Sequence, residues 1–125
     1  MNIIISNSSD LPIYEQIKEQ LKKHIMEGKL KAGEQLPSIR YLAKELRISV
    51  ITTKRAYDEL ESEGFINSVQ GKGSFVAVQN SEFIREEYLK KIEFHINEIL
   101  FYAKVSGISK SEIQEIINTM EEDDE

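Results

Sequence analysis

The sequence predicts a mainly α-helical fold that contains one small β-hairpin, and three observations carry this prediction. Residues 36–64 contain two short amphipathic segments joined by a tight turn. Residues 65–78 contain two alternating apolar runs separated by a Gly-Lys-Gly tip. From residue 82 to residue 105, apolar residues recur every three or four positions. With one more helix upstream, this order of elements is a winged helix-turn-helix followed by a two-helix C-terminal segment.

Length and composition narrow the class of protein. A chain of 125 residues is one domain, or one small domain with an appendage. It has no cysteine, which excludes disulfides and thiolate metal sites. No stretch reaches the roughly 18 consecutive apolar residues of a membrane span, and the N-terminus lacks the features of a signal peptide. We therefore expect a soluble, cytoplasmic protein with no membrane partner.

The first helix is expected to begin at Pro12, because the first helical turn tolerates the missing N–H of proline. The arm before it, residues 1–10, is polar from residue 6 onward and should be poorly ordered unless another segment holds it. Since no carboxylate cluster stands at metal-ligand spacing, His24 is interpreted as a packing residue. Gly28 should end the helix. The inward stripe is Ile13, Ile17, Leu21, His24 and Ile25, whereas Glu15, Lys18, Glu19, Lys22 and Lys23 should face water.

The next two helices are short, and each has a serine at its start. Ser38 and Ser49 are the expected N-caps, because a serine hydroxyl can accept a hydrogen bond from the first turn. Gly64 permits the left-handed turn that ends the second of these helices. A connection this short favours crossed packing. The inward positions are Ile39, Leu42, Ala43 and Leu46 in one helix and Thr53, Ala56, Tyr57 and Leu60 in the other.

Charge is distributed unevenly along a chain whose net charge is −6. Residues 36–57 contain five basic residues and one acidic residue, Glu45. Up to residue 79 there are eleven Lys and Arg against ten Asp and Glu, and from residue 80 onward there are five against twelve. The first part can approach nucleic-acid phosphates, and the second would be repelled by them. We therefore expect an arm (1–10), a winged-helix DNA-binding domain (11–79) and an acidic helical segment (80–125).

The tip of the expected hairpin is Gly71-Lys72-Gly73, and a short extended piece at Gln35 and Leu36 lies upstream. A nucleotide-binding loop is disfavoured, because the tip lacks the other glycines of such loops and does not run from a strand into a helix. A hairpin turn that needs positive φ explains both glycines. A lysine held between them could in addition reach a phosphate or the minor groove.

Four stretches resemble the DNA-binding domain of the GntR family of bacterial transcription regulators. They are PIYEQI at residues 12–17, GxLxxGEQLPSxRxLA at 28–43, TxxRAYxxLxxEGFI at 52–66 and GxGxFV at 71–76, where x is any residue. Together they span most of residues 11–78. The Ala56-Tyr57 pair and the short C-terminal segment are similar to the YtrA-like subfamily. Larger subfamilies carry effector domains for which the remaining residues are too few.

The resemblance implies roles for residues of the helical pair. Arg40 would bind a phosphate at the start of its helix, where its guanidinium and the helix dipole act together. Ser49, Thr52 and Lys54 would lie on the outer face of the recognition helix and meet phosphates and base edges. Arg55 is instead expected to form an ion pair with a nearby acid.

Val50 and Ile51 depart from the pattern of the family, in which many relatives have a basic or hydrogen-bonding residue. Apolar side chains can contact a thymine methyl group but cannot read guanine, so we expect a preference for A·T pairs. The resemblance also implies a contact between DNA and the hairpin tip, or wing. Its residues would be Gln70, Gly71, Lys72 and Gly73.

Residues 82–105 should form a long helix that ends at residues 106–107. A second helix should follow, with Ser109 and Glu112 as a capping box and an acidic tail, residues 121–125, that frays. Two helices with this much apolar surface cannot cover themselves, so we expect a homodimer through the C-terminal helices. The apolar stripes are Ile84, Tyr88, Ile92, Ile96, Ile99 and Ala103, and then Ile113, Ile116, Ile117 and Met120.

These observations favour a sequence-specific regulator of transcription, expected to act on double-stranded DNA as a homodimeric repressor at a palindromic operator. No catalytic constellation supports an enzyme, a DNA-processing enzyme included, and no cofactor is expected. The alternative is a winged-helix protein-interaction module without specific DNA binding. By resemblance, the regulated genes would be transporter genes. A small-molecule effector is compatible with the surface formed by Phe94, His95, Phe101 and Tyr102, although a dimer core explains the same residues.

Overall fold

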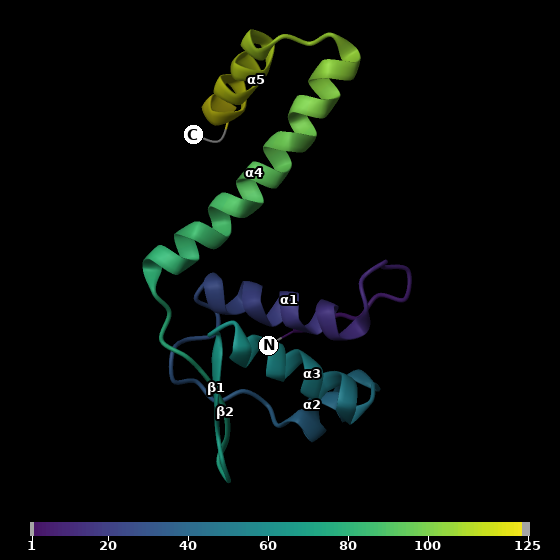
Figure 1. The fold of residues 1–125 in the computed structure, drawn as a ribbon, viewed down its shortest axis with the longest axis vertical. Helices are drawn as coiled ribbons and strands as arrows, with labels where there is room; N and C mark the ends of the chain where they lie inside the picture. The colour runs from purple at the N-terminus through teal and green to yellow at the C-terminus, as the bar shows by residue number, and fades with distance from the viewer. Residues whose placement is uncertain (1, 124–125) are drawn as a thin grey trace. The chain divides into compact units, whose positions relative to one another are not determined.

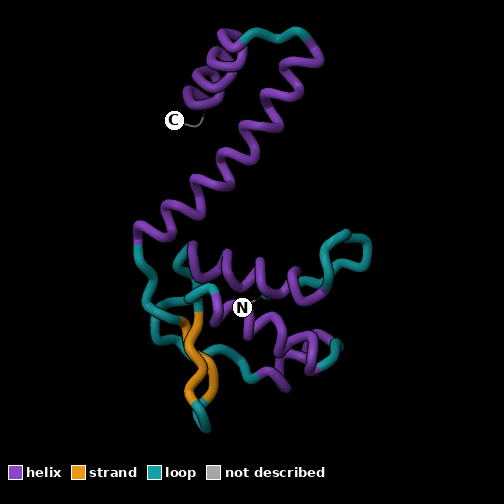
Figure 2. Tube along the Cα trace, in the orientation of Figure 1, coloured by secondary structure: helices purple, strands orange, loops and turns teal. Residues whose placement is uncertain are grey.

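The computed structural model describes residues 2–123, which divide into two compact units, one up to Asn80 and one from Ser81 onward (Figure 1). The first unit contains three helices and a two-stranded antiparallel sheet, and the second contains two helices (Figure 2). The expected mainly α-helical fold with one hairpin is confirmed. The elements are α1 (Ile13–Met26), α2 (Ile39–Leu46), α3 (Val50–Ser62), β1 (Ile66–Val69), β2 (Gly73–Val76), α4 (Ser81–Ser106) and α5 (Lys110–Asp123).

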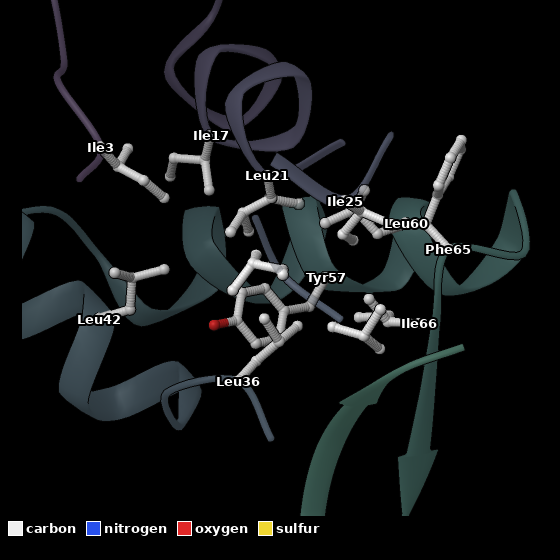
Figure 3. Packing of buried hydrophobic residues seen from close by; sticks show 13 residues of the cluster. Ile3, Ile17, Leu21, Ile25, Leu36, Leu42, Tyr57, Leu60, Phe65 and Ile66 are labelled. Carbon is white, nitrogen blue, oxygen red and sulfur yellow. The ribbon is translucent and has the colours of Figure 1, made fainter. Parts of the chain in front are cut away.

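The core of the first unit lies between α1, α3 and the sheet (Figure 3). Ile17, Leu21 and Ile25 of α1 are buried, as predicted. Ile13, predicted to point inward, is 38% exposed. His24, from the same stripe, is half-buried beside the N-terminal arm, and its Nε2 lies 3.4 Å from the Asn2 carbonyl. The buried face of α1 is therefore rotated away from Ile13 and His24, toward polar residues such as Gln16.

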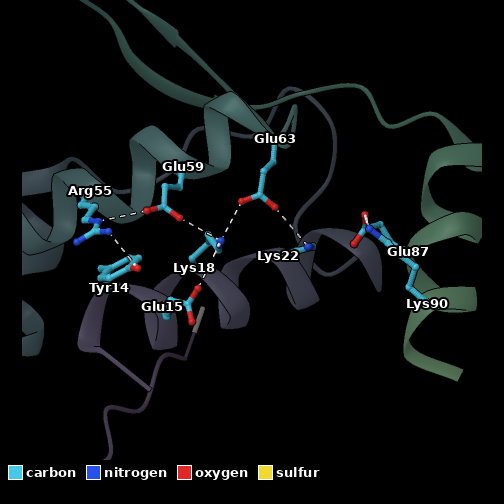
Figure 4. A network of polar contacts seen from close by, with 9 residues as sticks. All are labelled: Tyr14, Glu15, Lys18, Lys22, Arg55, Glu59, Glu63, Glu87 and Lys90. Carbon is cyan, nitrogen blue, oxygen red and sulfur yellow. Dashed lines mark hydrogen bonds and ion pairs between the residues drawn. The ribbon is translucent and has the colours of Figure 1, made fainter. Parts of the chain in front are cut away.

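The prediction that Lys18 and Lys22 face water is wrong, because both are buried against acidic residues of α3 and its C-terminal cap. The Lys18 Nζ lies 3.1 Å from Glu59 and 2.9 Å from Glu63 (Figure 4). Burial alone would lower the pKa of the Lys18 ammonium, but the hydrogen bonds and charges of Glu63 and Glu59 outweigh burial and hold this pKa above its ordinary value. The hydrogen bond from Lys18, followed by that from Arg55, lowers the pKa of Glu59.

Helices α2 and α3 begin at the serines that the sequence predicted. The Ser38 hydroxyl accepts a hydrogen bond from the Tyr41 N–H at 3.1 Å, and the Ser49 hydroxyl accepts one from the Thr52 N–H at 3.0 Å. Arg47 ends α2 with a left-handed backbone (φ 58°), which lets the chain reverse within three residues before α3. The two helices therefore form the expected helix-turn-helix.

Tyr57 holds the segment before α2 against α3. Its ring is buried and its hydroxyl donates to the Pro37 carbonyl at 2.8 Å. Burial raises the pKa of this phenol above its ordinary value, so the hydroxyl remains a donor at any physiological pH. The interpretation of Tyr57 and Phe65 as core residues is confirmed, because both rings are buried in the same cluster.

We expect Tyr57→Phe to lower the free energy of unfolding by about 1–2 kcal/mol, because the Pro37 carbonyl would lose its donor inside the protein. Chemical denaturation followed by circular dichroism measures this change. Tyr41→Phe is the matched control, since Tyr41 is 57% exposed and its loss should be neutral. Equal stability of the two variants would contradict the prediction.

The hairpin pairs Ile66 with Val76 and Val69 with Gly73, as an antiparallel ladder. The extended piece before α2 pairs with β2 through an isolated antiparallel bridge between Gln35 and Phe75. Leu36 N–H donates to the Ser74 carbonyl and Val76 N–H donates to the Glu34 carbonyl, each at 2.9 Å. The sheet is thereby tied to the start of α2, whereas the turn at its far end points away from α1 (Figure 1).

The N-terminal arm is held to α1 by two glutamines. Gln20 accepts from the Ile4 N–H and donates to the Ile4 carbonyl, and Gln16 makes the same pair of bonds with Ser6. Ile3 is buried in the core cluster. These contacts supply the anchor without which the arm was expected to be poorly ordered.

The second unit consists of α4 and α5, separated by a turn at Gly107. The predicted capping box is present, because Glu112 N–H donates to the Ser109 hydroxyl and Ser109 N–H donates to the Glu112 carboxylate. Helix α5 runs to Asp123, beyond the start of the acidic tail that was expected to fray, and residues 124–125 lie outside the described residues. Among residues 2–123, no helix is long and apolar enough to cross a membrane.

Candidate nucleic-acid interface

The outer face of α3 begins directly behind its serine cap. Val50 and Ile51, the first two residues of the helix, are 46% and 80% exposed. Lys54 is exposed one turn further along. The opposite face of α3 is buried in the core through Thr53, Ala56, Tyr57 and Leu60, as predicted. The helix therefore presents an outer strip that is apolar at its N-terminal end and charged beyond it.

Several polar groups on α3 already have partners. The Ser49 hydroxyl donates to the Thr52 hydroxyl at 2.7 Å in addition to capping the helix. Lys54 Nζ lies 2.7 Å from the Asp58 carboxylate in an exposed ion pair. Both interactions are short-range and solvent-accessible, so phosphates can compete with them at little cost. Thr52 is half-buried, and its backbone N–H is taken by the cap.

Arg55 is turned toward α1 and away from this strip. Its guanidinium lies 3.7 Å from the centre of the Tyr14 ring, and its Nε donates to Glu59 at 3.2 Å (Figure 4). The predicted ion pair of Arg55 is thus present, and this residue links α1 to α3.

Arg40 is the second residue of α2 and is exposed. The N-terminus of a helix carries partial positive charge from its unpaired N–H groups. A guanidinium at this end adds a full positive charge and a planar fork of donors. Chemically, the start of α2 is suited to bind a phosphate oxygen.

The wing is a tight turn whose geometry depends on Gln35. The Gln35 side chain donates from Nε2 to the Lys72 carbonyl at 2.9 Å, which fixes the turn from the side. Gly73 has φ +116°, and a Cβ added there would lie 2.9 Å from the same Nε2. Only glycine fits at this position without displacing Gln35. Gln70, Gly71 and Lys72 are exposed, so the Lys72 ammonium is presented to solvent.

The ten residues predicted to contact DNA come from three segments of the first unit, and all are exposed except the half-buried Thr52. Gln35 was not among them, because its sequence neighbourhood indicates only an extended piece. The pairing of Lys54 with Asp58 was also missed, although the i,i+4 spacing was a signal for it. Within residues 2–123, no group of three His, Cys, Asp or Glu residues is placed to hold a metal ion.

The residues considered for an effector lie on α4. Phe94, Phe101 and Tyr102 line an open depression of about 420 Å³, together with Asn97 and Glu98. His95 packs edge-on against Phe94, and its Nδ1 lies 2.8 Å from the Glu98 carboxylate. The depression is formed by one helix and is not enclosed, so the described chain does not by itself build a ligand cavity there.

Comparison with known proteins places this geometry in context. Residues 13–76 match the family described as bacterial regulatory proteins, gntR family. The HTH-type transcriptional repressor YtrA of Bacillus subtilis (strain 168) is 31% identical over 121 residues, which cover 97% of this chain and 93% of the relative. The crystal structure of a transcriptional regulator from Oenococcus oeni matches with a TM-score of 0.79 at 26% identity, covering 93% of this chain and 96% of that chain. The DNA-binding domain of AraR in complex with operator ORE1 matches with a TM-score of 0.53 at 32% identity, covering 62% of this chain and 94% of that chain.

Proposed function

The chain belongs to the GntR family of bacterial regulatory proteins, and from this premise we propose that it represses transcription as a homodimer on a palindromic operator. The family consists of DNA-binding transcription regulators and not of enzymes. The single observation that carries the proposal is the exposed outer strip of α3 behind a capped N-terminus, in a unit that also exposes Arg40 and the wing residues. A regulator of bacterial transcription must meet the chromosome, so its site of action is the cytoplasm.

In this proposal α3 is the recognition helix and enters the major groove with its N-terminal end first. Arg40 binds a phosphate beside the groove, and Ser49, Thr52 and Lys54 contact phosphates and base edges. Lys54 exchanges Asp58 for a phosphate when DNA arrives. Gln70, Gly71, Lys72 and Gly73 contact the neighbouring backbone, where the glycines permit close approach and Lys72 supplies the charge.

The proposed dimer is formed by the second unit. Tyr88, Ile92, Ile96 and Ile99 follow one face of α4 and are each at least 39% exposed in the single chain. Ile116, Ile117 and Met120 of α5 are exposed as well. An apolar surface of this extent is unusual on a monomer. A second copy of the chain is the occupant we propose, because two-fold pairing also supplies two recognition helices for a palindrome. By similarity to YtrA-like regulators, transporter genes would be the targets, and any small-molecule effector would bind at the depression lined by Phe94, Phe101 and Tyr102.

Salt dependence tests this function. We expect the full chain to bind a duplex from its own promoter region with an affinity that falls steeply as salt rises, with a log–log slope of about −0.9 for each phosphate contact. Fluorescence anisotropy at several salt concentrations measures the slope. Lys72→Ala should make it shallower by about 1 for each protomer bound.

Lys110→Ala is the matched control, because Lys110 lies in the second unit at the start of α5 and should leave the slope unchanged. A flat salt response of the parent chain would contradict the proposal and favour the alternative, a protein-interaction module without specific DNA binding.

A further inference from the structure

We propose that Ile51, with Val50 beside it, reads the 5-methyl group of thymine in the major groove of each operator half-site. The inference rests on the proposed function and specifies its substrate, namely a half-site with thymine at one or two fixed positions. It assigns sequence discrimination to apolar contact at the N-terminal end of α3.

Val50 and Ile51 stand at the end of α3 that would meet DNA first. Val50 and Ile51 are the first two residues of α3, and residues at this end of a recognition helix contact base edges. The core-facing residues Thr53, Ala56 and Leu60 lie on the other side of the helix. Ile51 is 80% exposed, so its side chain is available to a ligand that approaches α3 from outside.

The polar groups next to Val50 and Ile51 already interact within the protein. The Ser49 and Thr52 hydroxyls are bonded to one another, and the Lys54 ammonium is paired with Asp58. A base-edge hydrogen bond from the Ser49 hydroxyl would therefore replace an existing interaction, whereas the Thr52 hydroxyl and the Lys54 ammonium keep further donors of their own. Val50 and Ile51 have no such competing partner to lose, because their side chains make no hydrogen bonds.

The choice of base follows from these side chains. Guanine is read by paired donors, adenine by an amide and cytosine by an acceptor, and Val50 and Ile51 offer none of these. Thymine alone presents a methyl group in the major groove. A protein partner is disfavoured as the occupant, because two side chains at the positive end of a helix are far smaller than a stable protein interface.

The experiment compares thymine with uracil, which differ by this methyl group only. A duplex is first selected from a random pool by the full-length protein, and each thymine is then replaced singly by deoxyuridine. We expect about fourfold weaker binding for each half-site in which the contacted methyl is removed. Positions outside the contact should show no change.

Variants then assign the effect to the side chain. In Ile51→Ala the uracil penalty should disappear at one position, while binding to the unmodified duplex weakens by a similar factor. Val78→Ala is the matched control, because Val78 is 85% exposed and lies outside α3. This variant should keep the full penalty.

Three outcomes would overturn the inference. The parent protein could be insensitive to uracil at every position, or Ile51→Ala could retain the parent's penalty, which would assign the penalty to another side chain or to DNA shape. In both cases specific binding, and with it the proposed function, survives. Failure of the pool to enrich any duplex, together with salt-independent binding, would instead remove the proposed function and the inference together.

Discussion

Removal of residues 81–125 is expected to leave a folded monomer that binds operator DNA about 10²- to 10⁴-fold more weakly than the full chain. The remaining part has a core of its own, because every member of the buried cluster lies between Ile3 and Val76. Its recognition surface would be intact. What it would lose is the second recognition helix, whose binding becomes intramolecular once the first has bound. Sedimentation velocity and anisotropy titration of the same sample measure both changes.

A full-length variant separates dimerisation from truncation. Ile96→Glu combined with Ile99→Glu places two charges on the apolar stripe of α4, and should give the same monomer with the same loss of affinity. Lys91→Glu changes the charge of the same helix by the same two units at an exposed lysine outside the stripe and is the matched control. If the truncated protein still sediments as a dimer, or if the double variant binds DNA like its parent, the proposed role of the second unit is wrong.

Elements whose signals are local could be predicted from the sequence. The caps at Ser38, Ser49 and Ser109 each depend on a partner three residues away, so spacing alone identifies them. The hairpin could also be predicted from the sequence, because its glycines and alternating runs lie within 14 residues of one another. Burial of Tyr57 follows from helical periodicity.

Features that depend on distant partners could not be predicted. The pattern of its own helix predicts that Lys18 faces water. Only the folded structure places Glu59 and Glu63 next to it. The anchoring of the arm by Gln16 and Gln20 has the same origin, because a glutamine can bind backbone anywhere on the surface. Gln35 beside the wing is a third case.

For the candidate site, the sequence predicts which residues are exposed but not which polar groups already have partners. Periodicity places Val50, Ile51 and Lys54 on the outer face of α3, and the structure agrees that they are exposed. The sequence does not say which of these groups is already satisfied within the protein. Lys54 already has an ion-pair partner in Asp58, whereas the Ile51 side chain has no polar group that needs one. The proposed base readout therefore uses the apolar end of the helix.

Substitution of Lys18 by methionine is expected to lower the free energy of unfolding by about 1–2 kcal/mol, because the two carboxylates it leaves are only partly buried and are screened by water. Methionine fills most of the space of the lysine side chain, so the loss is mainly electrostatic. Glu59 and Glu63 would keep Arg55 and Lys22, respectively, but would lose their shared partner and face one another as like charges. Urea denaturation of the full chain measures the change, and Lys23→Met, an exposed lysine on the same helix, should be nearly neutral.

The pH dependence of the same pair of variants tests the cause. Lys18 lowers the pKa of Glu59, so the stability that this carboxylate contributes is present above its ordinary pKa of 4.5 and is lost as pH falls through the lowered value. The raised pKa of Lys18 keeps its ammonium protonated throughout this range, so the loss comes from protonation of its carboxylate partners. Lys18→Met should therefore lose less stability than the parent between neutral pH and strong acid, whereas Lys23→Met should follow the parent. Parallel curves for all three proteins would mean that Lys18 stabilises the fold through packing alone.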